Sequence, residues 1–495
     1  MPEHDTIAAV DLGSNSFHLQ VVRIVGGQIY ELDSLKESVR LAAGLDDDKR
    51  LSEPVQDAAL ACLHRFGERL HGFPPDAVRA VGTNALRVAR NAGSFLGRAR
   101  QALGFPIEII AGREEARLIY LGVAHGLPAS DENRLVVDIG GGSTECIVGN
   151  GLDPLHTESL YMGSVSYTQR YFQDGKITPA RMQRAEYAAR AELQTITSEF
   201  STAGWTSAFG ASGTARALGE MIFQNGLGER GITAEGLQGL RSLLTDAGEI
   251  RRLDIAGLSA DRAAIIAGGL AIMSAVVEEL QIESMELSPY ALRHGVLFDL
   301  LGRAQHHDMR ETTVEQFCQR YRVDMEQARR VESDALRLYA PIAQTLPEAQ
   351  RAALTQRLRW AARLHEIGIS IAYNGYHKHS AYIVQNADMP GFSKSDQAEL
   401  ALLVLAQRGS LGKTRSLVAG DDQWSLIAAL RLATLLNRRR ARRESAPLEL
   451  SAGESGFTVR ASAGWLTQHP LSATALEIEI DQWRAVNRAF VVEEY

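Results

Sequence analysis

The stretch Arg134-Leu-Val-Val-Asp-Ile-Gly-Gly-Gly-Ser-Thr-Glu145 decides the fold of this chain. Its apolar run predicts a buried strand, and Asp138 lies where the chain must turn out of the sheet. The glycines Gly140, Gly141 and Gly142 leave the turn without Cβ atoms, so backbone N–H groups can approach an anion closely and adopt positive φ where needed. Ser143 and Thr144 add hydroxyl donors. Carboxylates on both sides of the loop, Asp138 and Glu145, suit a Mg²⁺ ion that carries phosphate.

The same plan occurs a second time, near the start of the chain. In residues 7–28, as in residues 134–153, an apolar strand ends in Asp-apolar-Gly, a loop of small residues follows, and two further strands are joined by a glycine turn. A single glycine cluster would most simply be a tight hairpin with two solvated acids. An internal repeat is stronger evidence about architecture, so we predict a duplicated fold whose halves grip one phosphate chain between them. The matching residues are Asp11 with Asp138, Gly13 with Gly140, and His18 with Glu145.

The composition excludes several classes of protein. A chain of 495 residues is too long for one core, so three or four domains are expected. The net charge of −8 argues against a general nucleic-acid binder. The N-terminus shows no signal peptide, and the most apolar stretch, residues 263–277, is too short for a membrane span. Three widely spaced cysteines give neither a disulfide framework nor a zinc site. We therefore expect a cytoplasmic protein with no integral membrane segment.

The expected elements also repeat along the chain. Three strands, a helix at 52–70, a strand at 77–82, a helix at 91–103, a strand at 106–110 and a helix from 112 to about 124 form the first set. A second set follows residue 134, with helices at 179–200 and 215–225, a helix from 261, and strands at 207–210 and 284–287. Beyond Asp308 the pattern is helical to about Arg443. Short strands are expected at 448–450, 457–460 and 476–480. The predicted domains are residues 1–130, 131–308, 309–445 and 446–495.

Five motifs together resemble one family. They are Val10-Asp-Leu-Gly-Ser-Asn-Ser16, Val81-Gly-Thr-Asn-Ala-Leu-Arg87, Gly112-Arg-Glu-Glu-Ala-Arg117, Val137-Asp-Ile-Gly-Gly-Gly-Ser-Thr-Glu145 and Gly210-Ala-Ser-Gly-Thr214. Any one of them would be weak, but the set resembles the exopolyphosphatase/guanosine pentaphosphate phosphohydrolase (Ppx/GppA) family of the actin/Hsp70/sugar-kinase superfamily. The resemblance runs the whole length. It implies an α/β fold of two duplicated actin-like (ribonuclease H-like) domains, followed by an all-α HD-like domain and a small α+β C-terminal domain.

The resemblance also implies a site for water attack on a terminal phosphoanhydride. Such a reaction requires a metal ion, N–H donors, cations and a base that orients water. By similarity, Asp138 and Glu145 would hold Mg²⁺, and Asp11 would reach it directly or through water. The residues that would cradle phosphoryl oxygens are Gly13, Ser14, Asn15, Gly140, Gly141, Gly142, Ser143, Thr144 and Gly213.

Glu115 is the candidate catalytic base. It is the second Glu of the Glu-Glu-Ala motif and lies just inside a predicted helix start, at the position that resembles the family's catalytic acid. The simpler interpretation is an acid that interacts with the helix dipole, which suits Glu114 better.

Three arginines are candidate phosphate ligands, because guanidinium groups match phosphate oxygens: Arg87, Arg262 and Arg293. A structural ion pair is the alternative for each. Where relatives often read Ser-Asp-x-Ala-Leu-Arg-Glu-Gly, this chain has Pro289 and His294.

The helical region resembles HD-type metal phosphohydrolases, but the pair here is His365-Glu366, so a second metal centre is not expected. With the arginine run Arg438–Arg443, this region would instead form a wall for a long polyanion.

Four functions compete. The first is an exopolyphosphatase that releases orthophosphate from chain ends, and the second is a phosphohydrolase of guanosine 5'-triphosphate 3'-diphosphate (pppGpp) at the same site. The residues of Gly464-Trp-Leu-Thr-Gln-His-Pro-Leu471 resemble the second branch, while His377-Lys-His resembles the first, which we favour modestly. The third is a sugar kinase or Hsp70-like ATPase, and the fourth is a non-catalytic sensor. Long two-domain chains of this kind also make a homodimer plausible.

Overall fold

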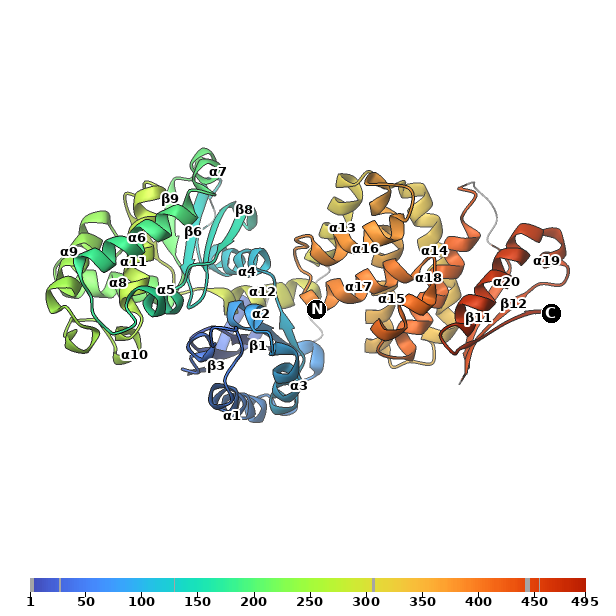
Figure 1. The fold of residues 1–495 in the computed structure, drawn as a ribbon, viewed down its shortest axis with the longest axis horizontal. Coiled ribbons are helices and arrows are strands. Elements are labelled where there is room, and N and C mark those ends of the chain that lie inside the picture. The colour runs from blue at the N-terminus through green and yellow to red at the C-terminus, as the bar shows by residue number, and fades with distance from the viewer. Residues whose placement is uncertain (1–3, 26–27, 129, 305–307, 441–445, 454) are drawn as a thin grey trace. The chain divides into compact units, whose positions relative to one another are not determined.

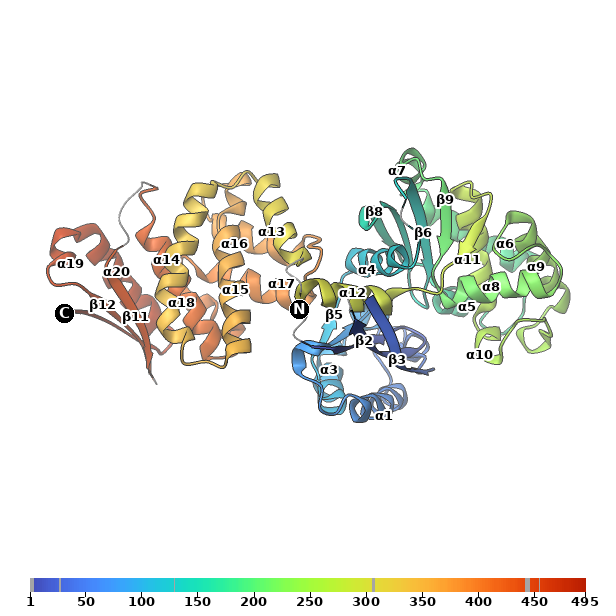
Figure 2. The ribbon, with the colours of Figure 1, turned by 180° about the vertical axis from the view of Figure 1, so that it is seen from behind.

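The computed structural model describes residues 4–25, 28–128, 130–304, 308–440, 446–453 and 455–495. The chain divides into two compact units, an N-terminal unit of residues 1–309 and a C-terminal unit of residues 310–495. Each is drawn in Figures 1 and 2 and is described by itself.

The N-terminal unit contains two sheets of the same topology. The first has the order β3-β2-β1-β4-β5, built from β1 (Thr6–Leu12), β2 (Phe17–Val25), β3 (Gln28–Glu37), β4 (Val78–Gly82) and β5 (Ile107–Ile109). The second has the order β8-β7-β6-β9-β10, built from β6 (Asn133–Ile139), β7 (Thr144–Asn150), β8 (Asp153–Leu160), β9 (Ser207–Gly210) and β10 (Met285–Leu287). In both sheets the first three strands are antiparallel and the last two run parallel to the central strand. The predicted duplication is therefore confirmed at the level of sheet order.

Helices cover the outer face of each sheet. The first sheet is covered by α1 (Glu53–Arg69) and α3 (Ala92–Leu103), with the short α2 (Asn84–Val88) after β4. The helices of the second half are α5 (Ser164–Tyr171), α6 (Pro179–Leu193), α7 (Thr197–Thr202), α8 (Gly213–Gln224), α9 (Ala234–Ala247), α10 (Ala260–Ala263) and α11 (Ile266–Glu279). The helix expected at 179–200 is thus two helices, and the one expected from 261 is divided in the same way.

Two helices lie between the sheets, α4 (Gly112–His125) and α12 (Leu292–Ala304) (Figures 1 and 2). Their core includes Ala9 of the first sheet and Val136 of the second, whereas the alternate residues Val10 and Val137 face the outer cores. This alternation follows from the two-residue period of a strand. The central core therefore joins the two halves.

α4 and α12 pack unusually closely because glycines face each other. A Cβ atom added at Gly122 would lie 2.6 Å from the carbonyl oxygen of Ala291, and one at Gly295 would lie 1.7 Å from that of Leu118. No side chain fits at either position without moving backbone.

The C-terminal unit combines helices and a sheet on one hydrophobic core. Its helices are α13 (Met309–Arg320), α14 (Met325–Ala343), α15 (Glu348–Leu364), α16 (Tyr376–Asn386), α17 (Lys394–Ala406), α18 (Asp421–Leu436), α19 (Trp465–Gln468) and α20 (Pro470–Arg484). Its sheet has the order β11-β12-β13, built from β11 (Leu448–Gly453), β12 (Gly456–Ala461) and β13 (Ala489–Glu494). Leu358 of the helical part and Val459 of the sheet belong to the same core, so the last fifty residues complete the helical bundle.

The prediction of a strand at residues 476–480 is wrong. Residues 476–480 lie inside α20, and β13 supplies the third strand instead. The alternation Leu-Glu-Ile-Glu-Ile imitates a strand, but Leu476, Glu479 and Trp483 are buried with the spacing of a helix face.

Two remaining features concern the predicted arginine run and membrane association. Of the run Arg438–Arg443, residues 441–443 lie outside the described part of the chain, and Arg440 forms ion pairs with Glu366 and Asp324. Within the described residues, no helix combines the length and apolarity that a membrane span requires.

A buried ion-pair network holds α4 and α12 to the first sheet. Arg117 donates to Glu114 at 2.7 Å and to Asp299 at 2.5 Å, and Arg79 of β4 donates to the second oxygen of Asp299 at 2.6 Å. Burial alone would raise the pKa of Asp299, but Arg117, Arg303 and Arg79 hold this pKa well below its usual range.

We expect Asp299→Asn to lower the free energy of unfolding at neutral pH by about 3–5 kcal/mol, because it removes the buried negative charge that Arg117, Arg303 and Arg79 share. Urea denaturation measures this loss. Because the folded-state pKa is depressed, the wild-type contribution is present above about pH 4, the usual pKa of Asp, and falls as the pH drops further. The difference between the two proteins should therefore shrink in acid. Asp174→Asn, which removes the exposed pair with Arg181, is the control and should change the stability little, because exposed ion pairs are screened by solvent. Equal stability of both variants at pH 7 would contradict this role of the network.

Candidate functional site

The two glycine hairpins have the same strand register. Asp11 pairs with His18 across β1 and β2, and Asp138 pairs with Glu145 across β6 and β7. The equivalence predicted from the repeat is therefore confirmed residue by residue at the strand ends.

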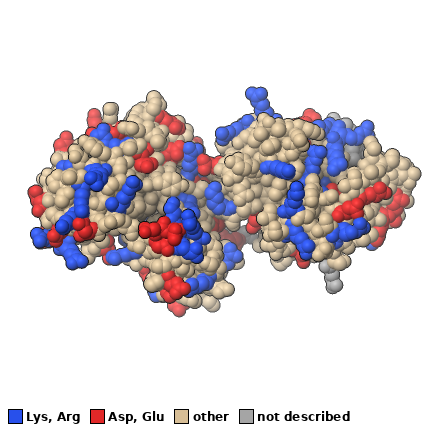
Figure 3. Space-filling model, viewed as in Figure 1, with Lys and Arg blue, Asp and Glu red and all other residues tan. Residues whose placement is uncertain are grey.

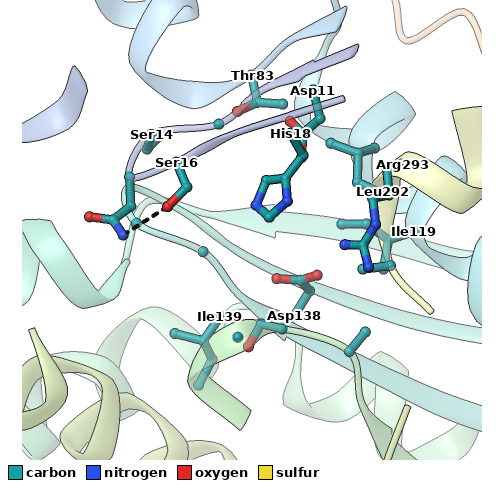
Figure 4. Close-up of a pocket in the computed structure, with 18 of the residues that line it drawn as sticks. Asp11, Ser14, Ser16, His18, Thr83, Ile119, Asp138, Ile139, Leu292 and Arg293 are labelled. Atoms are coloured by element: carbon teal, nitrogen blue, oxygen red, sulfur yellow. Dashed lines mark hydrogen bonds between the residues drawn. The ribbon is translucent and has the colours of Figure 1, made fainter. Parts of the chain in front are cut away.

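Both hairpin loops open into one cavity of about 130 Å³ in the N-terminal unit. Its walls include residues of β1, β2, β3, β6, α4, α5, α8, α10 and α12, so both halves contribute. Figure 4 shows His18 and Asp138 pointing toward each other across this space, with Arg293 reaching in beside them. The predicted site residues that line it are Asp11, Gly13, Ser14, Asn15, Glu115, Asp138, Gly140, Gly141, Ser143, Gly213, Arg262 and Arg293.

Four predicted residues do not line the cavity. The hydroxyl group of Thr144 donates a hydrogen bond to the carbonyl oxygen of Met162 at 2.6 Å, so this side chain stabilises the glycine loop. Glu145 is buried and accepts a hydrogen bond from Ser159 at 2.8 Å. Gly142 packs against Asn84. The fourth residue, Arg87, is described with Glu115 below.

The glycines of the second loop serve close approach rather than positive φ. None of Gly140, Gly141 and Gly142 is among the residues with positive φ. A Cβ atom at Gly142 would lie 2.5 Å from the side-chain oxygen of Asn84, and one at Gly141 would lie 3.0 Å from Cβ of Ser14 in the first loop. The absence of side chains therefore lets the two loops touch.

Three acidic residues at the site, Asp11, Asp138 and Glu145, have raised pKa values. Burial and the negative charge of Glu115 raise the pKa of Asp11 to about 8 and that of Asp138 to about 7. Burial, Glu115 and Asp138 also raise the pKa of Glu145 well above its usual value. Such repulsion between buried carboxylates is relieved by a cation.

The donor set fits a Mg²⁺ ion that is held partly by substrate. The Oδ1 atom of Asp11 is buried and has no hydrogen-bond partner among the described residues. Across that same part of the chain, no three His, Cys, Asp or Glu side chains converge as a complete metal cage. Magnesium is commonly bound by one or two carboxylates, waters and substrate phosphates, so a complete cage is not required.

Basic residues line the same cavity as the acids. Lys36 and Arg216 line it with Arg262 and Arg293, and His18 lies near all four. Burial, followed by the charges of Arg293 and Lys36, lowers the pKa of His18 to about 3, so this ring is neutral at physiological pH. Arg216 was missed by the sequence analysis, although it follows the Gly210–Thr214 motif by two residues. Lys36 was not among the residues predicted for the site either.

Glu114 and Glu115 point in different directions. Glu114 joins the buried network with Arg117, whereas Glu115 lines the cavity. Arg87 donates from Nη1 to Oε2 of Glu115 at 2.6 Å and to the carbonyl oxygen of Ile110 at 3.1 Å. For Arg87 the ion-pair alternative therefore holds, and its contact is with the candidate base.

The comparisons with known proteins agree with this geometry. The chain is 39% identical to a guanosine-5'-triphosphate,3'-diphosphate pyrophosphatase of Aeromonas hydrophila over 96% of both chains. Residues 20–304 match the sequence model of the Ppx/GppA phosphatase family, and residues 309–480 match the model of domain III of this family. The chain belongs to the Ppx/GppA phosphatase family. As a member of this family it is a phosphatase with two actin-like domains, as the sequence predicted.

Solved structures of Ppx/GppA proteins share the fold. An exopolyphosphatase of Cytophaga hutchinsonii is 28% identical, with a TM-score of 0.55, and the match covers 60% of this chain and 98% of that one. The PPX-GPPA enzyme of Aquifex aeolicus is 25% identical, with a TM-score of 0.50 over 59% of this chain and 98% of that one.

Within this family member, a buried glutamine orients Arg293. Gln20, on β2, accepts a hydrogen bond from Nε of Arg293 at 3.0 Å and donates to Glu31 at 3.2 Å. His294 lies on the other side of Gln20, with its Nε2 atom 3.5 Å from Nε2 of Gln20. The bond to Nε leaves the two terminal nitrogens of Arg293 for the cavity.

We expect Gln20→Leu to raise KM for the phosphate substrate about tenfold while changing kcat less than about twofold, because a hydrogen bond to a charged group orients a binding residue. Steady-state kinetics separate the two constants. Adding Gln20→Leu to Arg293→Met should change KM no further. Gln238→Leu, at an exposed position of the same unit, is the control. An equal additional loss in the double variant would show that Gln20 does not act through Arg293.

Proposed function

We propose that this phosphatase hydrolyses the terminal phosphoanhydride bond of guanosine 5'-triphosphate 3'-diphosphate at the cavity between the two hairpins. The observation that carries the proposal is that carboxylates that repel one another and a set of basic residues line the same cavity. A phosphate chain with its divalent cation would neutralise both sets. The relative named for this substrate matches over nearly the whole chain, which favours it over the polyphosphatase function preferred from sequence.

Hydrolysis of inorganic polyphosphate at the same site is the second candidate. It is supported by the Cytophaga hutchinsonii exopolyphosphatase, whose match covers a smaller part of this chain. The bond broken is the same in both substrates, so one set of residues would serve both.

In the proposed reaction, a water oxygen forms a bond to the terminal phosphorus while the bridging oxygen leaves with the remaining phosphates. Arg87 holds one oxygen of Glu115, and the other oxygen would accept the proton of the attacking water. Arg262 and Arg293 would bind phosphoryl oxygens, with donors from Ser14, Asn15 and Ser143 at the two loops. Asp11 and Asp138, which line the cavity, would hold Mg²⁺, and the ion would supply charge neutralisation to the phosphate chain. Glu145, the third predicted ligand, lies outside the cavity lining, and its part is tested separately below. The homodimer, the cytoplasmic location and the HD-like character of the helical region stay predictions.

Release of orthophosphate from the guanosine pentaphosphate, long-chain polyphosphate and ATP, measured side by side, tests the function. We expect the highest kcat/KM for the pentaphosphate and the lowest for ATP. Glu115→Gln should lower kcat by about 10²- to 10⁴-fold and keep substrate binding, since that is the usual contribution of a base. Glu68→Gln, an exposed acid on α1, is the control. A preference for ATP, or full turnover by Glu115→Gln, would overturn the proposal.

Metal dependence tests the carboxylates separately. Asp138→Asn and Glu145→Gln should each raise the Mg²⁺ concentration for half-maximal activity by about tenfold or more, as loss of a metal contact usually does. Asp131→Asn, exposed before β6, should leave the titration unchanged. Unchanged titrations in both site variants would place the metal elsewhere.

A further inference from the structure

We propose that Gly163 and Ser164, at the start of α5, are positioning residues that hold the second glycine loop, residues 140–142, in one orientation for phosphate. Their role rests on the proposed function, which makes this loop part of the phosphate site. Both residues act through the peptide groups of the loop.

The start of α5 holds two consecutive carbonyl groups of the loop. The backbone N–H group and the hydroxyl group of Ser164 both donate to the carbonyl oxygen of Gly140, at 2.9 and 3.0 Å. The N–H groups of Val165 and Ser166 donate to the carbonyl oxygen of Gly141 at 2.9 and 3.2 Å. N–H groups in the first turn of a helix have no partner within the helix. The glycine loop therefore satisfies the start of α5, and α5 in turn fixes the loop.

Holding these carbonyl groups also fixes the donors of the loop. The C=O and N–H groups of a trans peptide point in opposite directions, so the N–H groups of Gly141 and Gly142 point away from the donors on α5. Within the part of the chain that the structure describes, neither N–H group donates a hydrogen bond. Both are therefore available to an anion, which is the use expected of a glycine-rich loop.

Gly163 allows α5 to approach the loop this closely. A Cβ atom at Gly163 would lie 2.4 Å from the carbonyl carbon and oxygen of Gly141 and from the nitrogen of Gly142. All three are backbone atoms, so the loop or the helix would have to move to make room. The φ angle of Gly163 is −143°, which any residue can adopt, so the requirement for glycine is one of space.

The first half of the chain holds its own loop in the same way. A short 3₁₀ helix, η1 (Leu41–Gly44), follows β3. The N–H group of Ala42 donates to the carbonyl oxygen of Ser14 at 2.8 Å. That of Arg40, just before η1, donates to the carbonyl oxygen of Asn15 at 2.8 Å. Because α5 follows β8 at the equivalent place, each loop is held by the helix that follows the third strand of its half.

The helices η1 and α5 are in contact with each other. Val165 of α5 belongs to the hydrophobic core of the first half, together with Leu41 of η1. On another side of α5, the hydroxyl group of Thr168 donates to the carbonyl oxygen of Ser164 at 2.7 Å and accepts from the N–H group of Gly268 at 3.2 Å. α5 is thus attached to both halves, so the loop that it holds keeps a fixed place relative to the first loop.

The orientation of the loop matters because surface charge does not align a ligand here. On the face of the molecule drawn in Figure 3, basic and acidic side chains are intermixed. Such a mixture largely cancels any field of one sign, so a phosphate group is oriented by directed donors inside the cavity. The loop that α5 holds supplies N–H donors of this kind.

Ser164→Ala tests the side chain, because it removes one donor to Gly140 and leaves the backbone bond in place. We expect KM for the guanosine pentaphosphate to rise about threefold to tenfold and kcat to change less than about twofold, the effect of one neutral hydrogen bond that positions a binding group. Ser164→Thr keeps the hydroxyl group and should return KM to within about twofold of wild type. A residue with a structural role alone would lower stability and leave KM unchanged.

Gly163→Ala tests the close approach. We expect it to raise KM by at least about tenfold, because displacement of the loop backbone misplaces its donors. Gly97→Ala is the matched control, since Gly97 is exposed on α3 and a Cβ atom there would meet nothing within 4 Å. Should Gly163→Ala fail to fold, Ser164→Ala remains as the test.

Binding separates this role from the proposed function. Calorimetry with Mg²⁺ and tripolyphosphate on full-length Glu115→Gln protein should show an affinity that Ser164→Ala lowers by about threefold to tenfold. A wild-type protein that hydrolyses none of the substrates would refute the proposed function, whereas this loss of affinity would still support the role of α5. Unchanged KM and affinity in Ser164→Ala would remove Ser164 from that role, and the same result in folded Gly163→Ala would overturn the proposal.

Discussion

The close contact between α4 and α12 is the constraint on which the site depends. Gly122 and Gly295 allow the two helix backbones to touch, and the ion pairs of Asp299 with Arg117 and Arg79 hold that contact against the first sheet. The first turn of α4 carries Glu115 and the first turn of α12 carries Arg293. Both therefore enter the cavity from a rigid pair of helices, which suits groups that must be positioned accurately.

In the N-terminal unit, the charged residues that stabilise the fold are different from those that line the cavity. The network around Asp299 is internally neutralised, since carboxylates and guanidinium groups are in direct contact. In the cavity, by contrast, Asp138 and Glu115 repel each other, as do Arg262 and Arg216. Binding sites commonly retain such unfavourable arrangements, because a ligand supplies the missing charges.

The sequence predicted the parts of the site that local pattern determines. The two hairpins, the equivalence of Asp11 with Asp138 and of His18 with Glu145, and the position of Glu115 all follow from strand ends and helix starts. It could not predict contacts between distant segments. Arg87 was expected to bind phosphate, but it forms an ion pair with Glu115, with Nη1 of Arg87 2.6 Å from Oε2 of Glu115. Arg216 belongs to none of the five motifs, and only the fold brings α8 and β3 to the same cavity. The helix at 476–480 was missed because its alternating residues imitate a strand.

The identical register of the two hairpins has a consequence for the polarity of the ligand. Two hairpins with the same groups would offer equivalent surroundings to either end of a phosphate chain. Here the position across from one aspartate is a neutral imidazole, His18, and the position across from the other is the carboxylic acid Glu145. The backbones of the two hairpins are therefore equivalent, but their side chains are not. The two ends of a bound phosphate chain would meet different groups and are not interchangeable.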